Sequence, residues 1–382
     1  MIEVCDFQGG SQPPKAEWSK DPKPNYVRML QIRDFTQSAT DYVEYVKVSK
    51  SLKYCKEDDI LIGRYGASVG KILTGLAGAY NVAIIKSIPN EDIIIKKYIK
   101  SYFLSPRFQL NLGKVSLHRA AQAGFSKEDI ADFVIPVPPA QEQEKIVAEL
   151  DCLTGIIEKK KQQLKELDNL AQSIFYDMFG DPIANDKGWE MCKVGDCMKV
   201  IGGYAFKSSS YSKSGYRLVQ IANVWKDELV WDEITYISFN DKQVSSSFIL
   251  KEGDVLMAMT RPVIKSLSAV KIAIVRKEDT PCILNQRVCK FVSDGRLSII
   301  WFYNFARTEY FKDNIVGFGS KGMQPNVSAR EIESIKMYLP PRSLQDLYAK
   351  KIDAIEKQKE LVKRSIVETE TLFNSRMDYW FN

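Results

Sequence analysis

The residues of this chain that could carry out chemistry are one histidine and seven cysteines. A catalytic triad would depend entirely on His118, and no candidate nucleophile lies near it in the sequence. The cysteines form no Cys-x-x-Cys pair, whereas a structural zinc site needs four closely spaced Cys or His ligands. Their odd number and the absence of a secretion signal argue against a disulfide framework. We therefore expect reduced, mostly buried thiols, no metal and no catalytic residue in this chain.

A glycine-rich segment, Gly66–Lys71, resembles a phosphate-binding loop only superficially. It has one residue too few between its glycines, and Ile72 stands where a Ser or Thr would hold magnesium. A nucleoside triphosphate site is therefore excluded. Two interpretations stay open: a tight turn with solvated charges, or a loop that faces DNA. The residues that would then contact DNA are Arg64, Tyr65, Ser68 and Lys71.

No motif for methyl transfer or nucleotide binding appears elsewhere. The chain contains neither the Asn/Asp-Pro-Pro-Tyr/Phe motif of amino methylation nor a glycine-rich turn of the Rossmann type. A net charge of +6, from 54 basic and 48 acidic residues, permits a polyanionic partner without requiring one. The longest apolar stretch, 297–306, is too short to cross a bilayer, and the N-terminus lacks the features of a signal peptide. We expect a cytoplasmic protein with no membrane contact.

The elements that position these residues occur twice, because the sequence repeats itself. Gln31-Ile32 matches Gln220-Ile221, and residues 56–61 match 251–256. Further along, Gln122, Ser126, Ile130 and the proline pair 138–139 match Gln324, Ser328, Ile332 and 340–341, all at an offset of 202. The offset grows slowly along the chain, which indicates equivalent elements joined by loops of different length. Short apolar runs between turns, mixed with helix candidates at 94–104 and 298–311, predict an α/β domain in each half.

A long helix is predicted after each proline pair, over residues 141–179 and from 343 to the end. Apolar residues recur there at heptad spacing, which is typical of coiled-coil packing, and two such helices in one chain most economically pair antiparallel. The first series is Ile146, Leu150, Leu153, Ile157, Leu164, Leu167, Ala171, Ile174 and Met178. The second is Tyr348, Ile352, Ile355, Val362, Ile366 and Phe373.

Charged residues interrupt both series, at Lys160 in the first helix and Lys359 in the second. At the repeat offset, Ile157 corresponds to Lys359 and Lys160 to Val362, so the two helices are equivalent but not interchangeable. Polar residues in a seam often fix register at a cost in stability. Alternatively, both lysines extend from the edge of the seam to water. The sequence leaves both interpretations open.

This arrangement resembles the specificity subunits of Type I restriction-modification systems over essentially the whole chain. The resemblance depends on the Gln-Ile strands, on the run from Asp59 to Gly66, and on the Gln–Ser–Ile–Pro-Pro passages that enter each helix. It also depends on the first helix end, 173–180, which is echoed by 375–382. The fold class that it implies is α/β, with two duplicated target-recognition domains separated by two long antiparallel coiled-coil helices. The implied segments are recognition domains 1–139 and 181–341 and spacer helices 140–180 and 342–382.

In this family each recognition domain reads one half of a split double-stranded DNA target, and the helices set the spacing and dock two methyltransferase subunits. A motor-nuclease subunit joins for cleavage. AdoMet is expected on the methyltransferase, ATP and Mg on the motor-nuclease, and no cofactor on this chain. Because the two domains differ in sequence, the resemblance implies an asymmetric bipartite target.

Residues shared by both halves are expected to hold phosphates or brace loops, since domains with different targets cannot read bases with the same residues. Unshared polar and aromatic residues are better candidates for base reading. The shared group is His118, Arg119 and Gln122 with their counterparts Lys321 and Gln324. The unshared group is Lys15, Trp18 and Lys20 in the first half and Tyr204, Lys207, Arg261 and Lys265 in the second.

One departure from the repeat lies at the start of the chain. The second half opens with a segment that contains Trp189, Glu190 and Val194. At the repeat offset, the counterpart of this opening segment would lie before Met1, so the first half lacks it. Either the start is placed late or a strand is absent there. Three other functions remain open: the specificity subunit of a Type IIB-like system, a protein-interaction scaffold, and an enzyme with an unrecognised site.

Overall fold

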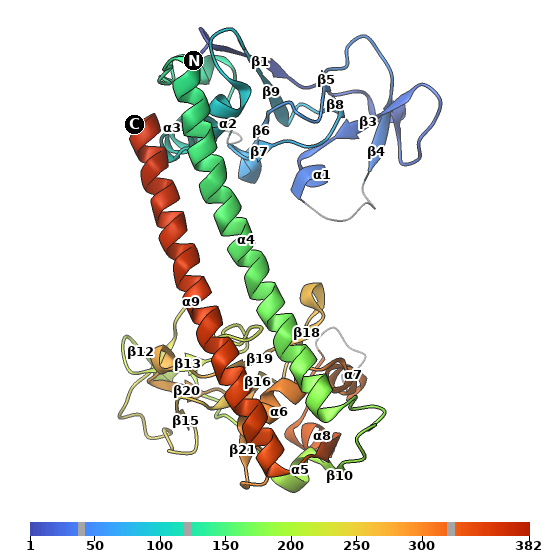
Figure 1. Cartoon of the computed structure of the whole chain (residues 1–382), viewed down its shortest axis with the longest axis vertical. Coiled ribbons are helices and arrows are strands. Elements are labelled where there is room, and N and C mark those ends of the chain that lie inside the picture. Colours follow the sequence, from blue (N-terminus) through green and yellow to red (C-terminus); the bar gives the residue numbers. More distant parts are fainter. Residues whose placement is uncertain (37–42, 118–123, 319–324) are drawn as a thin grey trace. The chain divides into compact units, whose positions relative to one another are not determined.

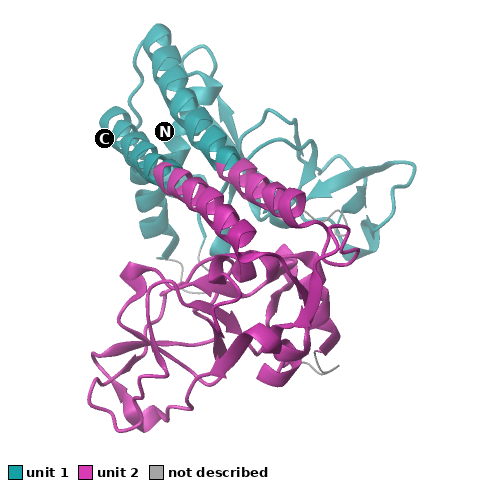
Figure 2. Ribbon diagram, turned by 60° about the horizontal axis from the view of Figure 1, so that its bottom comes forward, with its two compact units in different colours: residues 1–163, 362–382 teal, residues 164–361 magenta. Residues whose placement is uncertain are grey.

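The computed structural model describes residues 1–36, 43–117, 124–318 and 325–382 (Figure 1). The chain divides into two compact units (Figure 2). Unit 1 comprises Met1–Gln163 and Val362–Asn382, and unit 2 comprises Leu164–Leu361. Each long helix contributes to both units, so the four-segment division at residues 139, 180 and 341 stays a prediction.

The described residues of unit 1 form two sheets. In the first, β1 (Cys5–Gly9), β9 (Ile84–Pro89), β6 (Leu61–Gly63) and β7 (Ile72–Leu73) pair antiparallel in that order. The second has the order β2 (Trp18–Ser19), β4 (Glu44–Lys47), β3 (Tyr26–Leu30), β8 (Gly78–Tyr80), β5 (Tyr54–Cys55), and only β3 and β8 are parallel. The helices are α1 (Ile32–Thr36), α2 (Lys96–Leu104) and α3 (Pro106–Leu117). The apolar face of the first sheet packs against α2 and α3 in the core and includes Phe7, Ile62 and Ile85.

Unit 2 repeats both sheets in the same strand order. The first is β11 (Met198–Gly202), β21 (Val288–Ser293), β16 (Val255–Ala258), β19 (Ile272–Ile274). The second is β12 (Tyr211–Ser212), β14 (Tyr236–Ile237), β13 (Tyr216–Val219), β20 (Cys282–Leu284), β15 (Ile249–Leu250), and again one pair, β13 and β20, is parallel. This identity of topology confirms the duplicated α/β architecture predicted from the repeat.

Unit 2 also has elements without a strand counterpart among the described residues of unit 1. These are the hairpin β17 (Val263–Ile264)–β18 (Ala269–Val270) and the pair β10 (Glu190–Lys193)–β22 (Lys336–Leu339). Its shorter helices are α5 (Val194–Cys197), α6 (Ile299–Phe305), α7 (Glu309–Phe318) and α8 (Ala329–Ser334). The prediction of a single helix over 298–311 is wrong, because α6 ends at Phe305 and Thr308 stands immediately before α7. Its hydroxyl donates to the Phe305 carbonyl at 2.7 Å and accepts from the Phe311 amide at 3.3 Å.

The two predicted long helices are confirmed as α4 (Ala140–Phe179) and α9 (Arg342–Phe381), each of 40 residues. Within unit 1 the first part of α4 lies beside the last part of α9, and within unit 2 the remaining parts pair (Figure 2). In unit 1 Glu149 bonds Arg376 and Lys160 bonds Thr369, and in unit 2 Asp168 bonds Lys359 and Phe175 packs on Tyr348. Within each unit the contact on α9 moves backward as that on α4 moves forward, so each pairing is antiparallel.

The predicted heptad positions are buried along most of α4 but not at its end. Ile174 and Met178 are only half-buried, whereas Phe175 and Phe179 are buried. A straight helix with 3.6 residues per turn drifts away from a strict seven-residue repeat. At this end the two phenylalanines pack on Trp301 of α6, with ring centroids 5.9 and 5.8 Å away. The helix therefore turns its packing face from the seam toward the domain.

A buried glutamine anchors each long helix to the domain that precedes it. Gln143, one turn inside α4, accepts from the Ile95 amide at 2.8 Å and donates to the carbonyls of Ile93 and Pro138. Gln345 in α9 accepts from the Ser298 amide at 2.7 Å and donates to the carbonyls of Arg296 and Pro340. The exposed fractions of Gln143 and Gln345 are 1% and 0%. No local pattern in the sequence singles out these two glutamines, although they match at the repeat offset of 202.

Candidate nucleic-acid interface

The glycine-rich loop of unit 1 and the β17–β18 hairpin of unit 2 occupy the same place in their sheets. In unit 1 the amide of Gly63, at the end of β6, donates to the Lys71 carbonyl at 2.8 Å. In unit 2 the amide of Ala258, at the end of β16, donates to the Lys271 carbonyl at 3.0 Å. Lys71 and Lys271 are therefore structural equivalents, and the segment between strands is longer in unit 2. This difference lies where the two halves are expected to read different bases.

The unit 1 loop is joined to the segment that follows residues 118–123. Tyr65 forms a β-bridge with Gly124, and a Cβ on Gly124 would lie 2.6 Å from the Tyr65 ring. The Arg64 Nε donates to the Phe125 carbonyl at 2.6 Å, and its guanidinium lies over the Tyr65 ring. Arg64 and Tyr65 thus brace the loop as well as line it. The predicted contacts His118, Arg119 and Gln122 lie outside the described residues.

Unit 2 joins the equivalent segments in the same way. Thr260 forms a bridge with Asn326, and the Arg261 amide donates to the Pro325 carbonyl at 2.8 Å. Arg287 donates to the Thr260 hydroxyl at 3.2 Å. Lys321 and Gln324, which precede Pro325 in the chain, lie outside the described residues. In both units the structure thus places the predicted strand-end loop beside the segment that follows the predicted glutamine loop.

Exposed positive charge gathers around the hairpin. Arg261 and Lys265 are exposed and form no ion pair within the part of the chain that the structure describes. Arg261 has a positive φ of 49°, an uncommon conformation for a side chain of this size. Lys271 lies over the Trp225 ring at 5.6 Å, and burial together with the nearby Arg261 charge lowers the pKa of Lys271. Mutual repulsion between these cations would be relieved by a polyanion.

Two basic residues of this region, Lys271 and Arg287, were missed by the sequence analysis. Lys271 could have been found only through its equivalence to Lys71, which the unequal loop lengths hide in the sequence. Arg287 follows β20 and has alanine as its counterpart, because the Met259 amide donates to the Arg287 carbonyl as the Arg64 amide donates to that of Ala83. It therefore belongs with the unshared residues.

The remaining predicted contacts divide into exposed lysines and packed aromatics. Lys15, Lys20, Lys71 and Lys207 are exposed. Trp18 is half-buried on the small core around Met29 and Val46, and its indole N–H donates to the Pro13 carbonyl at 3.1 Å. Tyr204 packs on Phe206 and Phe248. These two aromatic rings support the second sheet of each unit, which leaves the lysines as the freer candidates. Ser68 is turned inward, since its hydroxyl donates to the Tyr65 carbonyl at 2.6 Å.

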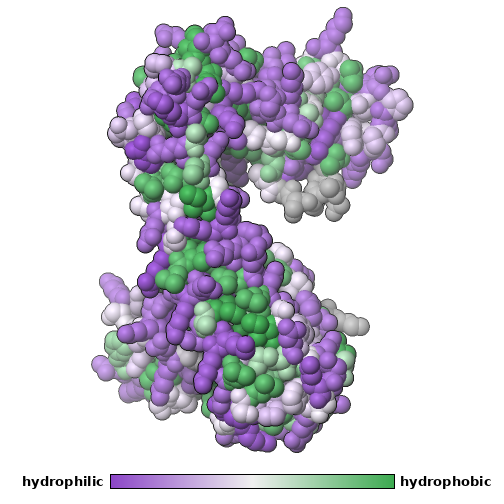
Figure 3. All heavy atoms as spheres, in the orientation of Figure 1, coloured by the Kyte–Doolittle hydropathy of each residue, from purple (hydrophilic) through white to green (hydrophobic). Residues whose placement is uncertain are grey.

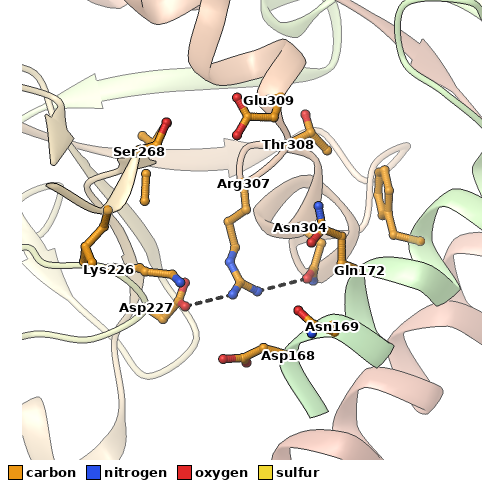
Figure 4. A pocket seen from close by; sticks show the side chains of 14 residues that line it. Asp168, Asn169, Gln172, Lys226, Asp227, Ser268, Asn304, Arg307, Thr308 and Glu309 are labelled. Carbon is orange, nitrogen blue, oxygen red and sulfur yellow. Dashed lines mark hydrogen bonds and ion pairs between the residues drawn. The ribbon is translucent and has the colours of Figure 1, made fainter. Parts of the chain in front are cut away.

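A cavity of about 270 Å³ lies behind the hairpin within unit 2 (Figure 4). Its walls come from α4, the turn at 226–227, residues 267–270 of the hairpin, and residues 304–309. Arg307 points into it between Asp227, at 2.8 Å, and Asn304, at 3.3 Å (Figure 4). Because these partners use the guanidinium, Arg307 is engaged within unit 2 and is not available to hold a ligand in this cavity.

The described residues contain no group of three or more His, Cys, Asp or Glu side chains placed to share a metal ion. Four cysteines, Cys5, Cys192, Cys282 and Cys289, have a pKa that burial raises to about 12, so they are poor nucleophiles at neutral pH. Polar side chains cover most of the visible face, and apolar side chains gather in a patch on the part of that face that belongs to unit 2 (Figure 3). Exposed apolar residues on α9 include Leu361 in unit 2 and Tyr379 in unit 1. Among the described helices, none combines the length and apolarity that crossing a membrane requires.

Comparison with known proteins places this geometry in a family. Residues 2–169 and 186–371 match the sequence model described as "Type I restriction modification DNA specificity domain". The Type I restriction enzyme MjaVIII specificity subunit of Methanocaldococcus jannaschii is 24% identical over 337 residues, covering 84% of this chain and 77% of that protein. The Type I restriction enzyme EcoAI specificity subunit of Escherichia coli is 31% identical over 174 residues, covering 46% of this chain and 29% of that protein.

Two solved structures share the fold across nearly the whole chain. A chain from a study of complex assembly and conformational transition of the type I R-M system has a TM-score of 0.58 at 15% identity, covering 98% of this chain and 97% of that one. The Type I restriction-modification S subunit from M. genitalium has a TM-score of 0.53 at 12% identity, covering 100% of this chain and 94% of that one.

Proposed function

The chain belongs to the family of Type I restriction-modification DNA specificity subunits, and from that premise we propose that it reads an asymmetric, bipartite duplex DNA target. The observation that carries the proposal is the pair of equivalent loops at the ends of β6 and β16. Both units contain the same two sheets, but the segments at these strand ends differ. Unit 1 has an eight-residue loop (64–71), and unit 2 has a longer segment (259–271) that contains the β17–β18 hairpin. A common scaffold with different reading loops is what recognition of two different half-sites requires.

Phosphate contact and base reading are divided between shared and unshared residues in this proposal. Lys71 and Lys271, which hold equivalent positions, attract phosphates and orient each unit on the duplex. Arg261, Lys265 and Arg287 lie on or beside the hairpin of unit 2, which has no counterpart among the described residues of unit 1, so they are candidates for base edges in the major groove. The exposed Lys15, Lys20 and Lys207 are further unshared candidates for base reading.

The chemistry that follows recognition belongs to partners in this proposal. Two methyltransferase subunits carrying AdoMet dock on α4 and α9, and a motor-nuclease subunit with ATP and Mg joins where cleavage occurs. The long helices support this role because they keep apolar side chains such as Leu361 and Tyr379 exposed. Each helix continues from one unit into the other, so the helices also set the separation of the half-sites.

Co-expression of the chain with the methyltransferase encoded beside it tests the proposal. Genome-wide mapping of methylated adenines should return one asymmetric motif made of two short half-sites at constant spacing. The methyltransferase expressed without this chain is the control and should leave no such motif. A continuous symmetric motif would overturn the bipartite proposal, and the absence of any motif would favour an interaction scaffold.

A further inference from the structure

Trp225 is a tryptophan at the surface of unit 2, in the turn that follows β13. Its side chain is 38% exposed. Within the described part of the chain its indole N–H forms no hydrogen bond. Four of the other five tryptophans donate theirs to a protein oxygen: Trp18, Trp189, Trp231 and Trp380. Trp225 therefore keeps part of its ring and its only polar group available at the surface, whereas tryptophans that serve packing usually have a partner for the N–H.

The turn that carries Trp225 is closed by its own backbone. Val224 and Leu229 form an antiparallel β-bridge, and the Trp225 amide donates to the Glu228 carbonyl at 3.1 Å. The turn is therefore a short hairpin tip with a defined conformation.

Asp227 fixes this tip to the rest of unit 2. It has a positive φ of 68°, and its amide donates to the Ile272 carbonyl at 3.0 Å. Its carboxylate accepts from the Tyr303 hydroxyl at 2.9 Å and from Arg307 at 2.8 Å (Figure 4). Three contacts on one turn residue hold the backbone beside Trp225 in place, so the ring is presented in a defined position.

Trp225 also lies among the cations that are proposed to meet DNA. The ammonium group of Lys271 is over the Trp225 ring, 5.6 Å from its centroid. Arg261 is close enough to Lys271 for its charge to help lower the Lys271 pKa. A duplex held by these cations would therefore come near the exposed part of the ring.

The two halves of the chain differ at this position. The offset of 189 that relates Gln31 to Gln220 brings Trp225 to Thr36, the last residue of α1. Unit 1 thus has a short helix where unit 2 has the turn. Trp225 belongs with the unshared residues, so a contact that it makes would be specific to one half-site.

We propose that Trp225 recognises a thymine in the half-site of unit 2 by packing its exposed ring on the C5-methyl group. This inference rests on the proposed function, because it adds a contact to the same DNA-reading surface. The methyl group of thymine is the apolar group that base pairs offer in the major groove. Cationic side chains such as Arg261 bind acceptor atoms and do not detect it, whereas an aromatic ring does. A ring that is already fixed on its turn also loses little conformational entropy on contact.

Replacement of single thymines by deoxyuridine tests the contact, because it removes only the C5-methyl group. The full chain, co-expressed with the methyltransferase encoded beside it, is bound to duplexes that carry the mapped target with one thymine replaced at a time. At one position the replacement should weaken binding by the parent about fourfold, the effect of one buried methyl group. Trp225→Ala should bind both duplexes equally.

Leu267→Ala is the matched control. Leu267 is also an apolar residue of unit 2 and is 51% exposed, but it lines the cavity behind the β17–β18 hairpin. The variant should keep the fourfold difference between thymine and deoxyuridine.

Photocrosslinking provides a second readout that needs no variant. 5-Iododeoxyuridine at the sensitive position places iodine where the methyl group lies, and ultraviolet light joins this base to an aromatic ring in contact with it. Mass spectrometry of the crosslinked parent should identify Trp225. A crosslink to another residue, or none, would overturn the proposal even if Trp225→Ala were too unstable to assay.

The binding assay separates failure of this contact from failure of the proposed function. A parent that prefers the mapped target to unrelated DNA but is indifferent to every thymine replacement would overturn the contact alone. So would a Trp225→Ala variant that keeps the difference, or a Leu267→Ala variant that loses it. A parent without preference for the mapped target would overturn the proposed function itself.

Discussion

Lys71 and Lys271 occupy equivalent positions in the first sheets of the two units, whereas the other residues of the two loops differ. Their proposed contact with phosphate can therefore be tested separately from base reading. If both lysines contact phosphates, Lys271→Ala should weaken binding of duplex DNA about equally for cognate and unrelated sequences. It should also reduce the slope of log K against log salt by about 1. Binding at several salt concentrations measures both.

The exposed Lys187, which lies in the turn after α4, offers a matched control. Lys187→Ala removes one positive charge from the same unit without touching the hairpin, so it should leave the salt slope unchanged. A loss of discrimination between sequences in Lys271→Ala would contradict the assignment of this residue to phosphate.

Gln143 places a fully used amide group at the junction of the first domain and α4. Gln143→Leu would fill the same volume but leave the Ile95 amide and the carbonyls of Ile93 and Pro138 unpaired. Buried unpaired groups are costly, so the free energy of unfolding should fall by about 2–4 kcal/mol. Urea denaturation measures the change. Gln141→Leu, at an exposed position two residues earlier, should change stability by less than about 0.5 kcal/mol.

Equal effects of the two substitutions would show that Gln143 acts through helix propensity alone. The same comparison applies to Gln345 in α9, whose three hydrogen bonds repeat those of Gln143.

At the scale of elements, the structure decides between the two interpretations of the charged seam positions. Lys359 is 8% exposed and bonds Asp168 of α4 and Glu356 of its own helix, both at 2.8 Å. Lys160 donates to the Ser365 carbonyl and the Thr369 hydroxyl of α9. Neither lysine simply extends to water, and each bonds the opposite helix within its own unit. The polar positions therefore favour the register-fixing role.

Removing one of these cross-helix contacts should measurably loosen the pair. Lys359→Ala leaves Asp168 without its cross-helix partner and should lower the free energy of unfolding by about 1–2 kcal/mol, less than for a fully buried ion pair. Lys357→Ala is the control, because Lys357 is 75% exposed in its side chain and bonds only Asp353 of the same helix. If Lys359→Ala is as stable as Lys357→Ala, the result would favour the other interpretation, in which the seam lysines extend to water.

The other end of the helix pair makes stability depend on pH. In unit 1, Glu149 accepts from Arg376 and from the Trp380 indole, each at 3.0 Å, and the hydrogen bond from Arg376 lowers the pKa of Glu149 below its usual value. A carboxylate with a lowered folded-state pKa stabilises the fold above its unfolded pKa, about 4.3. That stabilisation is lost as the pH falls from this value through the folded-state pKa.

Glu149→Gln should therefore be less stable than the parent at pH 7, and this difference should shrink toward pH 3. Thermal unfolding at pH 7, 5, 4 and 3 measures the effect. Glu144→Gln, at an exposed position on the same helix, should run parallel to the parent across the range. A stability difference that does not vary with pH would exclude Glu149 as the titrating group.

At the scale of the whole molecule, the duplication predicts that recognition is modular. Each unit has its own sheets, core and reading loop, so exchanging residues 1–139 for those of a homologue should change one half-site and leave the other and the spacing intact. Methylation mapping of the exchanged protein with the same methyltransferase checks this. A change in both half-sites would show that the units read DNA jointly.

Much of the architecture could be predicted from sequence because it depends on local or repeated patterns. The heptad spacing identified α4 and α9 nearly to the residue, and the repeated Gln, Ser, Ile and proline positions identified the duplication. The glycine-rich loop was also found from the sequence, because six consecutive residues are enough to recognise it and to show that it departs from the phosphate-binding motif. Among the candidate DNA contacts, the exposed lysines could be proposed from their positive charge alone.

The sequence by itself therefore determined that the chain is a duplicated α/β protein with two long helices, and it excluded the common catalytic motifs. Only the tertiary structure decided which residues are equivalent between the halves where loop lengths differ, as for Lys71 and Lys271. It also decided that Phe175 replaces Ile174 in the packed face of α4. The physical reason is common to both: strand register and helix rotation are set by contacts between residues far apart in the chain, and no local pattern encodes them.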